Sequence, residues 1–231
     1  ASHPFLPTII LPHGGPTARD WLRYDYQVQV LASRGYAVFQ MNFRGSSGYG
    51  SAFQESGYGE WGQAMQDDIT DGVTWLVNQG IADPNRICIF GGSYGGYAAL
   101  MGAAKTPDLY RCAVSLNGVS DLAGMVTYAT KEMGRQSIAH IGDERTDREN
   151  LDEYSPLYRA DEIKAPVMLI AGTWDATVPF EQSESMALAL KNANKDYEFV
   201  VLERTGHSLN SRRARNRFLS ELERFLAKNL R

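Results

Sequence analysis

The segment RICIFGGSYGGYAALMGAA (residues 86–104) passes from a β-rich apolar run through a glycine-rich turn into a helical pattern. At the turn it contains G-x-S-x-G, with Ser93 between Gly91 and Gly95. A serine on so sharp a strand-to-helix turn has a strained backbone, and larger side chains two positions away would collide with it. The helix that follows directs its amino terminus, which favours negative charge, toward the serine. The segment therefore predicts a nucleophilic serine at the carboxyl end of a strand.

Short apolar runs alternate with longer helical patterns along most of the chain. Runs that are hydrophobic on both faces and separated by helices predict a parallel sheet covered on both sides. The expected fold class is therefore α/β, with a doubly wound and mostly parallel sheet. The predicted strands are Thr8–Leu11, Ala37–Met41, Arg86–Phe90, Cys112–Leu116, Val167–Ala171 and Glu198–Leu202. The predicted helices are Arg19–Ser33, Gln63–Gln79, Tyr94–Ala104, Phe180–Lys191 and Arg212–Lys228.

Residues 120–165 interrupt this alternation and are rich in Met, Tyr and charged residues. We expect a helical insertion there, before the strand that starts at Val167. A length of 231 residues fits one α/β domain with a single large core. Residues 1–231 are therefore expected to form one domain.

A serine needs a base to be nucleophilic at neutral pH. His207 lies in RTGHSL, a predicted loop between the last strand and the last helix. Sites in parallel sheets form beyond the carboxyl ends of the strands, so this position suits the base. Asp175 is the only carboxylate in VMLIAGTWDATVP, which follows the preceding strand, and it can orient the imidazole. The order Ser93, Asp175, His207 predicts a serine hydrolase with a catalytic triad.

Alternatives to two of these assignments stay open. Asp121 also follows a predicted strand and is the reserve acid. Asp175 could instead serve only as an Asx-type turn residue ahead of the next helix. The other histidines suit the base less well, because His3 is close to the start of the chain, His13 precedes a glycine pair and His140 lies in the insertion.

The sequence TIILPHGGPT places Gly14 and Gly15 just after the first predicted strand. Glycine lets the backbone approach a substrate closely and leaves N–H groups free to donate. In the hydrolase arrangement, the oxyanion hole combines the N–H after the nucleophile with one from an early strand–helix loop. Gly15 and Tyr94 are therefore the predicted oxyanion-hole donors, with Gly14 as the alternative to Gly15. Tyr97 and Val119 are candidate pocket residues by position alone.

Composition excludes several other classes of function. The net charge of −4 gives no general attraction to nucleic acid or to an anionic membrane, and no apolar run approaches the length of a bilayer span. The basic residues within 212–217 are expected at the solvated start of an amphipathic helix. The carboxylates Asp67, Asp68 and Asp71 are interpreted as favourable charges in the first half of a helix rather than as a metal or glycosidase site.

Two further groups of residues have competing interpretations. Cys88 and Cys112 are too few for a disulfide framework and lie in predicted strands, so buried thiols are expected. The aromatic residues Trp21, Tyr24 and Tyr26 could line a substrate entrance or pack on the sheet. Packing on the sheet is the favoured expectation.

Six motifs together resemble the catalytic domain of the prolyl oligopeptidase family of serine peptidases, and within it the acylaminoacyl-peptidase-like branch. They are HGGP at 13–16, NFRGSSGYG at 42–50, WGQAMQDD at 61–68, GIADPNRICIFGGSYGGY at 80–97, GTWDATVPFEQS at 172–183 and GHSL at 206–209. The resemblance implies the α/β-hydrolase fold, the triad Ser93, Asp175 and His207, and the oxyanion donors Gly15 and Tyr94.

The resemblance implies hydrolysis of peptide, acyl-aminoacyl or ester bonds in small substrates, with no metal or other cofactor. Members usually have a β-propeller ahead of this domain, and residues 1–231 contain none. The chain is therefore expected to be either the catalytic part of a protein with an N-terminal propeller or a stand-alone carboxylesterase. Relatives often have Arg or Asn two residues after the acid, where this chain has Thr177.

A non-catalytic binding module that has kept the fold is the third interpretation. No nucleic acid or membrane is expected as a partner, and a homo-oligomer is compatible with the sequence. The compartment is undecided, with the cytoplasm favoured.

Overall fold

A computed structural model of the chain describes residues 5–132, 134 and 140–230. Its centre is a six-stranded sheet with the order β2-β1-β3-β4-β5-β6, in which every neighbouring pair is parallel. The strands are β1 (Leu6–Ile10), β2 (Ala37–Phe39), β3 (Ala82–Gly92), β4 (Cys112–Leu116), β5 (Val167–Gly172) and β6 (Tyr197–Leu202). The predicted parallel α/β fold is confirmed.

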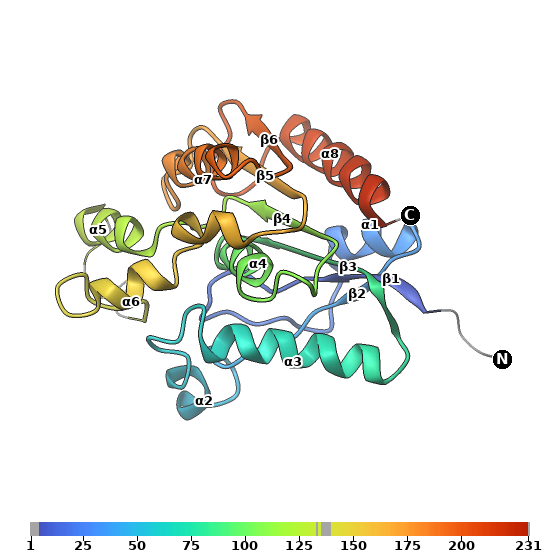
Figure 1. The fold of residues 1–231 in the computed structure, drawn as a ribbon, viewed down its shortest axis with the longest axis horizontal. Coiled ribbons are helices and arrows are strands. Elements are labelled where there is room, and N and C mark those ends of the chain that lie inside the picture. The colour runs from blue at the N-terminus through green and yellow to red at the C-terminus, as the bar shows by residue number, and fades with distance from the viewer. Residues whose placement is uncertain (1–4, 133, 135–139, 231) are drawn as a thin grey trace.

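Helices cover both faces of the sheet (Figure 1). They are α1 (Tyr26–Ser33), α2 (Ser51–Glu55), α3 (Ala64–Asn78), α4 (Tyr94–Lys105), α5 (Leu122–Glu132), α6 (Arg148–Glu153), the 3-10 helix η2 (Pro156–Glu162), α7 (Phe180–Asn192) and α8 (Arg212–Leu230). The side chains of each strand alternate between the two faces, so neighbouring residues belong to different cores. Ile10 packs with residues of α3, α4 and α7, whereas Ile9 packs with residues of α1 and α8.

The strand order reverses between β1 and β3, because the chain passes from β1 to the edge strand β2 and then returns to the other side of β1. In open α/β sheets, sites form at such a reversal, beyond the carboxyl ends of the strands. The loop with Gly14 and Gly15 follows β1, and Ser93 follows β3. The topology therefore brings these two segments to one edge of the sheet.

One predicted helix begins later than expected. Helix α1 starts at Tyr26 rather than Arg19, and Asp25 is its N-cap, because the Asp25 carboxylate accepts hydrogen bonds from the N–H groups of Gln27 and Val28. Residues 16–25 form a loop beyond β1 instead. The predicted insertion contains α5, α6 and η2, and its residues 133 and 135–139 lie outside the described part.

The two cysteines are buried, as expected, but they are not free thiols. Cys88 and Cys112 lie opposite one another on β3 and β4, with their Cα atoms 4.7 Å apart, and form a disulfide. The sequence alone could not show that this register places them side by side. None of the helices in the described residues combines the length and the apolar character needed to cross a membrane.

Candidate active site

Ser93 lies in the strained turn that the G-x-S-x-G motif predicts. Its φ of 57° and ψ of −123° are unusual for a residue with a side chain, and its N–H donates to the carbonyl oxygen of Leu116 at 2.9 Å. A Cβ atom at Gly91 would overlap the backbone of Gly95, and one at Gly95 would overlap the carbonyl group of Pro12. Glycine is therefore required at both positions by the close approach of backbone segments.

Helix α4 begins directly after the serine, at Tyr94. The first N–H groups of a helix have no partner within the helix, so the Tyr94 N–H is available to a ligand. The Tyr94 ring is fully buried, and this burial raises the pKa of its phenol above the ordinary value. Tyr94 can therefore act in the site through its backbone only. A Cβ atom at Gly14 would lie 3.5 Å from the Cβ of Ser93, so the loop after β1 lies against the nucleophile.

The predicted acid and base are hydrogen-bonded to each other. His207 Nδ1 lies 2.6 Å from Asp175 Oδ2, and the Asp175 side chain is only 1% exposed, whereas that of His207 is 26% exposed. The other oxygen, Oδ1, accepts the N–H groups of Thr177 at 2.8 Å and Val178 at 2.9 Å. One oxygen of Asp175 therefore orders its own turn while the second bonds to the imidazole, so the turn role does not exclude the predicted role as the acid.

Asn117 connects the segments that contain Ser93 and His207. It follows Leu116, the acceptor of the Ser93 N–H, and its side-chain Nδ2 donates to the carbonyl oxygen of His207 at 3.0 Å. Its Oδ1 accepts the N–H of Gly172, at the end of β5, at 2.9 Å. No hydrogen bond between the Ser93 hydroxyl and the His207 imidazole is present in the described part of the chain. The structure thus brings both residues to the end of β4 without joining them directly.

His13 contacts the loop predicted to contain the oxyanion hole. Its Nδ1 lies 2.8 Å from the carbonyl oxygen of Gly14, its Nε2 lies 2.9 Å from Ser46 Oγ, and its ring stacks on Phe43 with centroids 4.4 Å apart. A carbonyl oxygen only accepts, so Nδ1 must carry a proton. Burial lowers the pKa of His13, which favours the neutral ring. In a planar trans peptide, C=O and N–H point in opposite directions, so this contact also orients the N–H of Gly15.

Sequence reasoning missed the roles of Asn117 and His13. For His13 the available signal was its position directly before the glycine pair, where its side chain can reach the peptide group that joins the two glycines. For Asn117 no signal was available, because its partners come from β5 and from the loop after β6.

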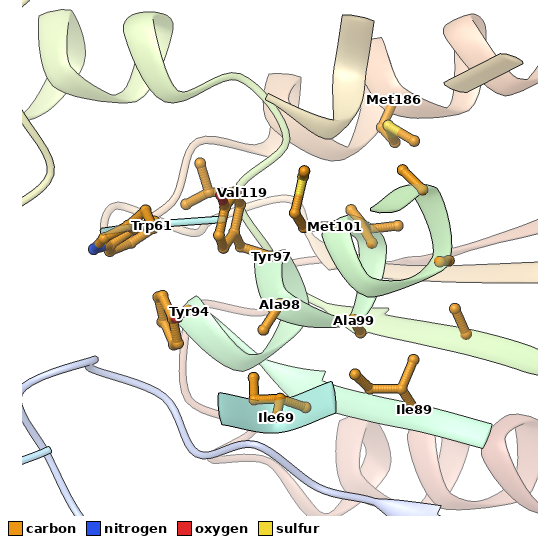
Figure 2. Packing of buried hydrophobic residues seen from close by; sticks show 14 of the residues in the cluster. Trp61, Ile69, Ile89, Tyr94, Tyr97, Ala98, Ala99, Met101, Val119 and Met186 are labelled. Carbon is orange, nitrogen blue, oxygen red and sulfur yellow. The ribbon is translucent and has the colours of Figure 1, made fainter. Parts of the chain in front are cut away.

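Four aromatic and aliphatic side chains pack together beside the start of α4 (Figure 2). The Trp61 ring contacts Tyr94 edge-on, with centroids 4.5 Å apart, and lies 5.0 Å from Tyr97. Tyr97 is fully buried and donates its hydroxyl to the carbonyl oxygen of Tyr154 at 3.0 Å. Val119 is 2% exposed. Tyr97 and Val119 are thus core residues.

Asp121, the reserve acid, is part of a different environment. Its Oδ1 accepts the N–H of Gly124 at 2.9 Å, near the start of α5, and its side chain lines a pocket of about 400 Å³ together with Tyr128 and Glu181. His207 is hydrogen-bonded to Asp175 and not to Asp121.

Acidic residues of α3 form ion pairs. Asp67 lies 2.6 Å from Lys105 Nζ, and Asp68 binds the guanidinium of Arg44 through two hydrogen bonds of 2.7 and 2.8 Å. No group of three or more potential metal ligands is present within the residues that the structure describes.

The expectation that the aromatic group at residues 21–26 packs on the sheet is wrong for two of its members. Trp21 is 56% exposed and Tyr24 is 79% exposed. They lie in the loop that replaces the first half of the predicted helix, so their side chains extend away from the core.

Comparisons with known proteins place the chain in a family. Residues 22–231 match the model of the Prolyl oligopeptidase family. The chain is 39% identical over 230 residues to dipeptidyl aminopeptidase BIII of Pseudoxanthomonas mexicana, an alignment that covers 97% of this chain and 33% of that protein.

Solved structures of peptidases are also similar to this chain. A puromycin-hydrolyzing peptidase of Mycobacterium tuberculosis superposes with a TM-score of 0.93 at 33% identity, over 98% of this chain and 34% of that one. An acylaminoacyl peptidase of Pyrococcus horikoshii gives a TM-score of 0.90 at 30% identity, over 98% of this chain and 37% of that one. The chain spans about a third of the length of these relatives. The chain therefore belongs to the prolyl oligopeptidase family of serine peptidases, as its motifs predicted, and has their α/β-hydrolase fold.

Proposed function

We propose that this chain hydrolyses small peptides through an acyl-enzyme on Ser93, with His207 as base and Asp175 as the residue that orients it. The observation that supports this most strongly is the 2.6 Å hydrogen bond between His207 Nδ1 and a buried Asp175 carboxylate. It fixes the imidazole tautomer that leaves Nε2 free to accept a proton. This tautomer is the one that a base needs in order to take a proton from a serine hydroxyl.

The reaction proceeds in two acyl transfers. Ser93 Oγ attacks the substrate carbonyl while His207 Nε2 takes the hydroxyl proton, and the developing oxyanion accepts hydrogen bonds from the N–H groups of Gly15 and Tyr94. His207 then donates that proton to the leaving amine as the carbon–nitrogen bond breaks. A water molecule, deprotonated by the same imidazole, releases the acyl group and restores the serine. The steps use only side chains and backbone groups of this chain, so no metal or organic cofactor takes part.

The substrate class follows from the relatives. Two of them are named as a dipeptidyl aminopeptidase and an acylaminoacyl peptidase. Both names describe hydrolysis of a bond next to an aminoacyl residue. A short peptide is therefore the proposed substrate. The relatives are about three times as long as this chain. We therefore include in the proposal an N-terminal propeller in the full-length protein.

Two measurements test the proposal. A fluorophosphonate probe should label the wild-type chain and leave Ser93→Ala unlabelled. Turnover of an aminoacyl anilide should exceed the background of Ser93→Ala by at least about a thousandfold. Cleavage of a short p-nitrophenyl ester without any cleavage of anilides or peptides would indicate a carboxylesterase instead. Absence of labelling in folded protein would indicate a non-catalytic binding module.

A further inference from the structure

Arg19 lies in the loop after β1 and has no carboxylate partner within the residues that the structure describes. Its guanidinium carbon lies over two aromatic rings, 3.8 Å from the centroid of Trp21 and 4.7 Å from that of Tyr49. Its Nη1 makes one long hydrogen bond, of 3.4 Å, to the carbonyl oxygen of Gly48. The positive charge is thus stabilised by π faces and not neutralised by an anion.

Neighbouring contacts fix the position of this side chain. A side chain at Gly48 would overlap the Arg19 guanidinium, so glycine there makes room for it. The side-chain amide of Asn42 binds the backbone of Asp20, the residue that follows Arg19. It accepts a hydrogen bond from the Asp20 N–H at 2.8 Å and donates one to the Asp20 carbonyl oxygen at 3.2 Å. The same amide donates to the Tyr49 hydroxyl at 2.9 Å. One amide therefore orders both the loop that contains Arg19 and a ring on which it lies.

The N–H groups at the edge of the Arg19 guanidinium remain available to bind an anion. Its Nε is buried and has no hydrogen-bond partner among the described residues. An aromatic ring interacts with the cation through its face, which leaves in-plane N–H groups to donate. The planar fork of arginine matches the two oxygens of a carboxylate. Partial burial strengthens such a pair relative to one in water.

The position of Arg19 in the chain suits binding of a charged group on the substrate. Arg19 is four residues after Gly15, so the Cα atoms are at most about 14 Å apart, a distance that an arginine side chain and an extended peptide together can span. Gly14, at the start of this loop, lies against Ser93. An extended peptide advances about 3.4 Å per residue, so a carboxylate two or three residues from the scissile bond comes within reach. The chain itself has a net charge of −4, which makes a local cation necessary for binding an anionic group.

We propose that Arg19 is a specificity residue that binds a carboxylate of the substrate, within about three residues of the bond that is cleaved. The carboxylate is either the C-terminus of a short peptide or an acidic side chain. This inference rests on the proposed peptidase function and deepens it, because it names the chemical group that the rim of the site selects.

The test compares three peptides that carry a C-terminal carboxylate, no carboxylate, or a side-chain carboxylate. Gly-Phe-Ala-Ala with a free C-terminus, its C-terminal amide, and Gly-Phe-Ala-Glu amide separate the terminal carboxylate from the side-chain carboxylate. We expect kcat/KM of the wild-type full chain to be about tenfold higher for at least one carboxylate peptide than for the neutral amide. In Arg19→Met that ratio should fall to about one, while cleavage of the neutral amide stays within about threefold of wild type.

Arg23→Met is the matched control, because Arg23 is an exposed arginine of the same loop and its removal changes the net charge equally. It should leave the preference for carboxylates unchanged. Arg19→Lys, which keeps the charge but loses the planar fork, should retain part of the preference. Equal losses on charged and neutral peptides in Arg19→Met would assign Arg19 to loop structure alone and overturn the inference. Absence of any preference in wild type, or its disappearance in Arg23→Met, would also overturn it. A chain that cleaves none of the peptides and does not react with the fluorophosphonate probe would refute the proposed function itself, and this inference with it.

Discussion

The Nδ1 atom of His13 lies 2.8 Å from the carbonyl oxygen of Gly14, the residue that follows it. Through the planar Gly14–Gly15 peptide, this hydrogen bond sets the direction of the Gly15 N–H. The partly buried imidazole of His13 thus supports one of the two proposed oxyanion donors.

Replacement of His13 should reduce the rate of the chemical step. His13→Ala leaves the Gly14 carbonyl oxygen unsupported, so we expect kcat to fall by about ten- to a hundredfold, with a smaller change in KM, because the N–H acts mainly on the transition state. Steady-state kinetics with an aminoacyl anilide measures this. Ser46→Ala is the control, since it removes the partner of Nε2, together with the hydrogen bond from Ser46 Oγ to the carbonyl oxygen of Phe43, and keeps the contact with Gly14. A similar loss in Ser46→Ala would show that general packing around the ring, not the orientation of the peptide, determines the rate.

Asp175→Asn separates the two roles of that carboxylate. The amide oxygen can still accept the N–H groups of Thr177 and Val178, whereas its NH2 group cannot accept the proton of His207 Nδ1. We expect kcat to fall by about 10³- to 10⁴-fold with an almost unchanged melting temperature. Kinetics and thermal unfolding on the same preparation check both parts. Activity within tenfold of wild type would remove Asp175 from the triad.

The two adjacent glycines before Ser93 should respond to one added methyl group to very different extents. A Cβ at Gly91 would overlap the backbone of Gly95, whereas a Cβ at Gly92 has as its nearest neighbour the carbonyl oxygen of Leu116 at 3.7 Å. Gly91→Ala should therefore reduce the free energy of unfolding by about 3 kcal/mol, and Gly92→Ala by less than about 1 kcal/mol. Urea denaturation measures both values. Equal tolerance of the two substitutions would contradict the packing described for this turn.

Asp20 should make stability depend on pH in the acidic range. Burial, and next the charge of Asp25, raise the pKa of Asp20 from its ordinary value of 3.8 to about 6, although the Gln40 hydrogen bond and the charge of Arg23 oppose this. The folded state thus binds a proton at a higher pH than the unfolded state, so this residue favours folding increasingly as the pH falls from about 7 to 4.5.

The Asp20→Asn variant tests this dependence. It keeps an oxygen for Gln40 but has no charge to titrate. Between pH 7 and 4.5, the free energy of unfolding of wild type should increase relative to that of Asp20→Asn by about 1–2 kcal/mol, a figure reduced for solvent screening. Urea titrations of both proteins at the two pH values measure the difference. A constant difference would show that Asp20 titrates normally in the folded chain.

Much of the fold could be predicted from local patterns. The apolar runs at 112–116 and 167–171 became β4 and most of β5, and the helix predicted at Tyr94–Ala104 is α4 with one additional residue. The turn at Ser93 was also recognisable, because the G-x-S-x-G motif is itself local, although the structure shows that Gly95 is required by the distant carbonyl group of Pro12. The assignment of the triad, by contrast, remains a prediction that kinetics must test.

The sequence by itself determined the order of strands and helices, the strained turn at Ser93 and the family, because each depends on residues that are close together in the chain or on a specific set of motifs. Only the tertiary structure decided which side chains meet. Residues 19–25 form a loop rather than a helix because the side chain of Asn42, more than fifteen residues beyond this segment, makes hydrogen bonds with the backbone of Asp20. The pairing of Cys88 with Cys112 depends on the register of two strands, and the contact between Asp175 and His207 on the approach of two loops. Such contacts arise from the packing of distant segments, and local propensity contains no information about them.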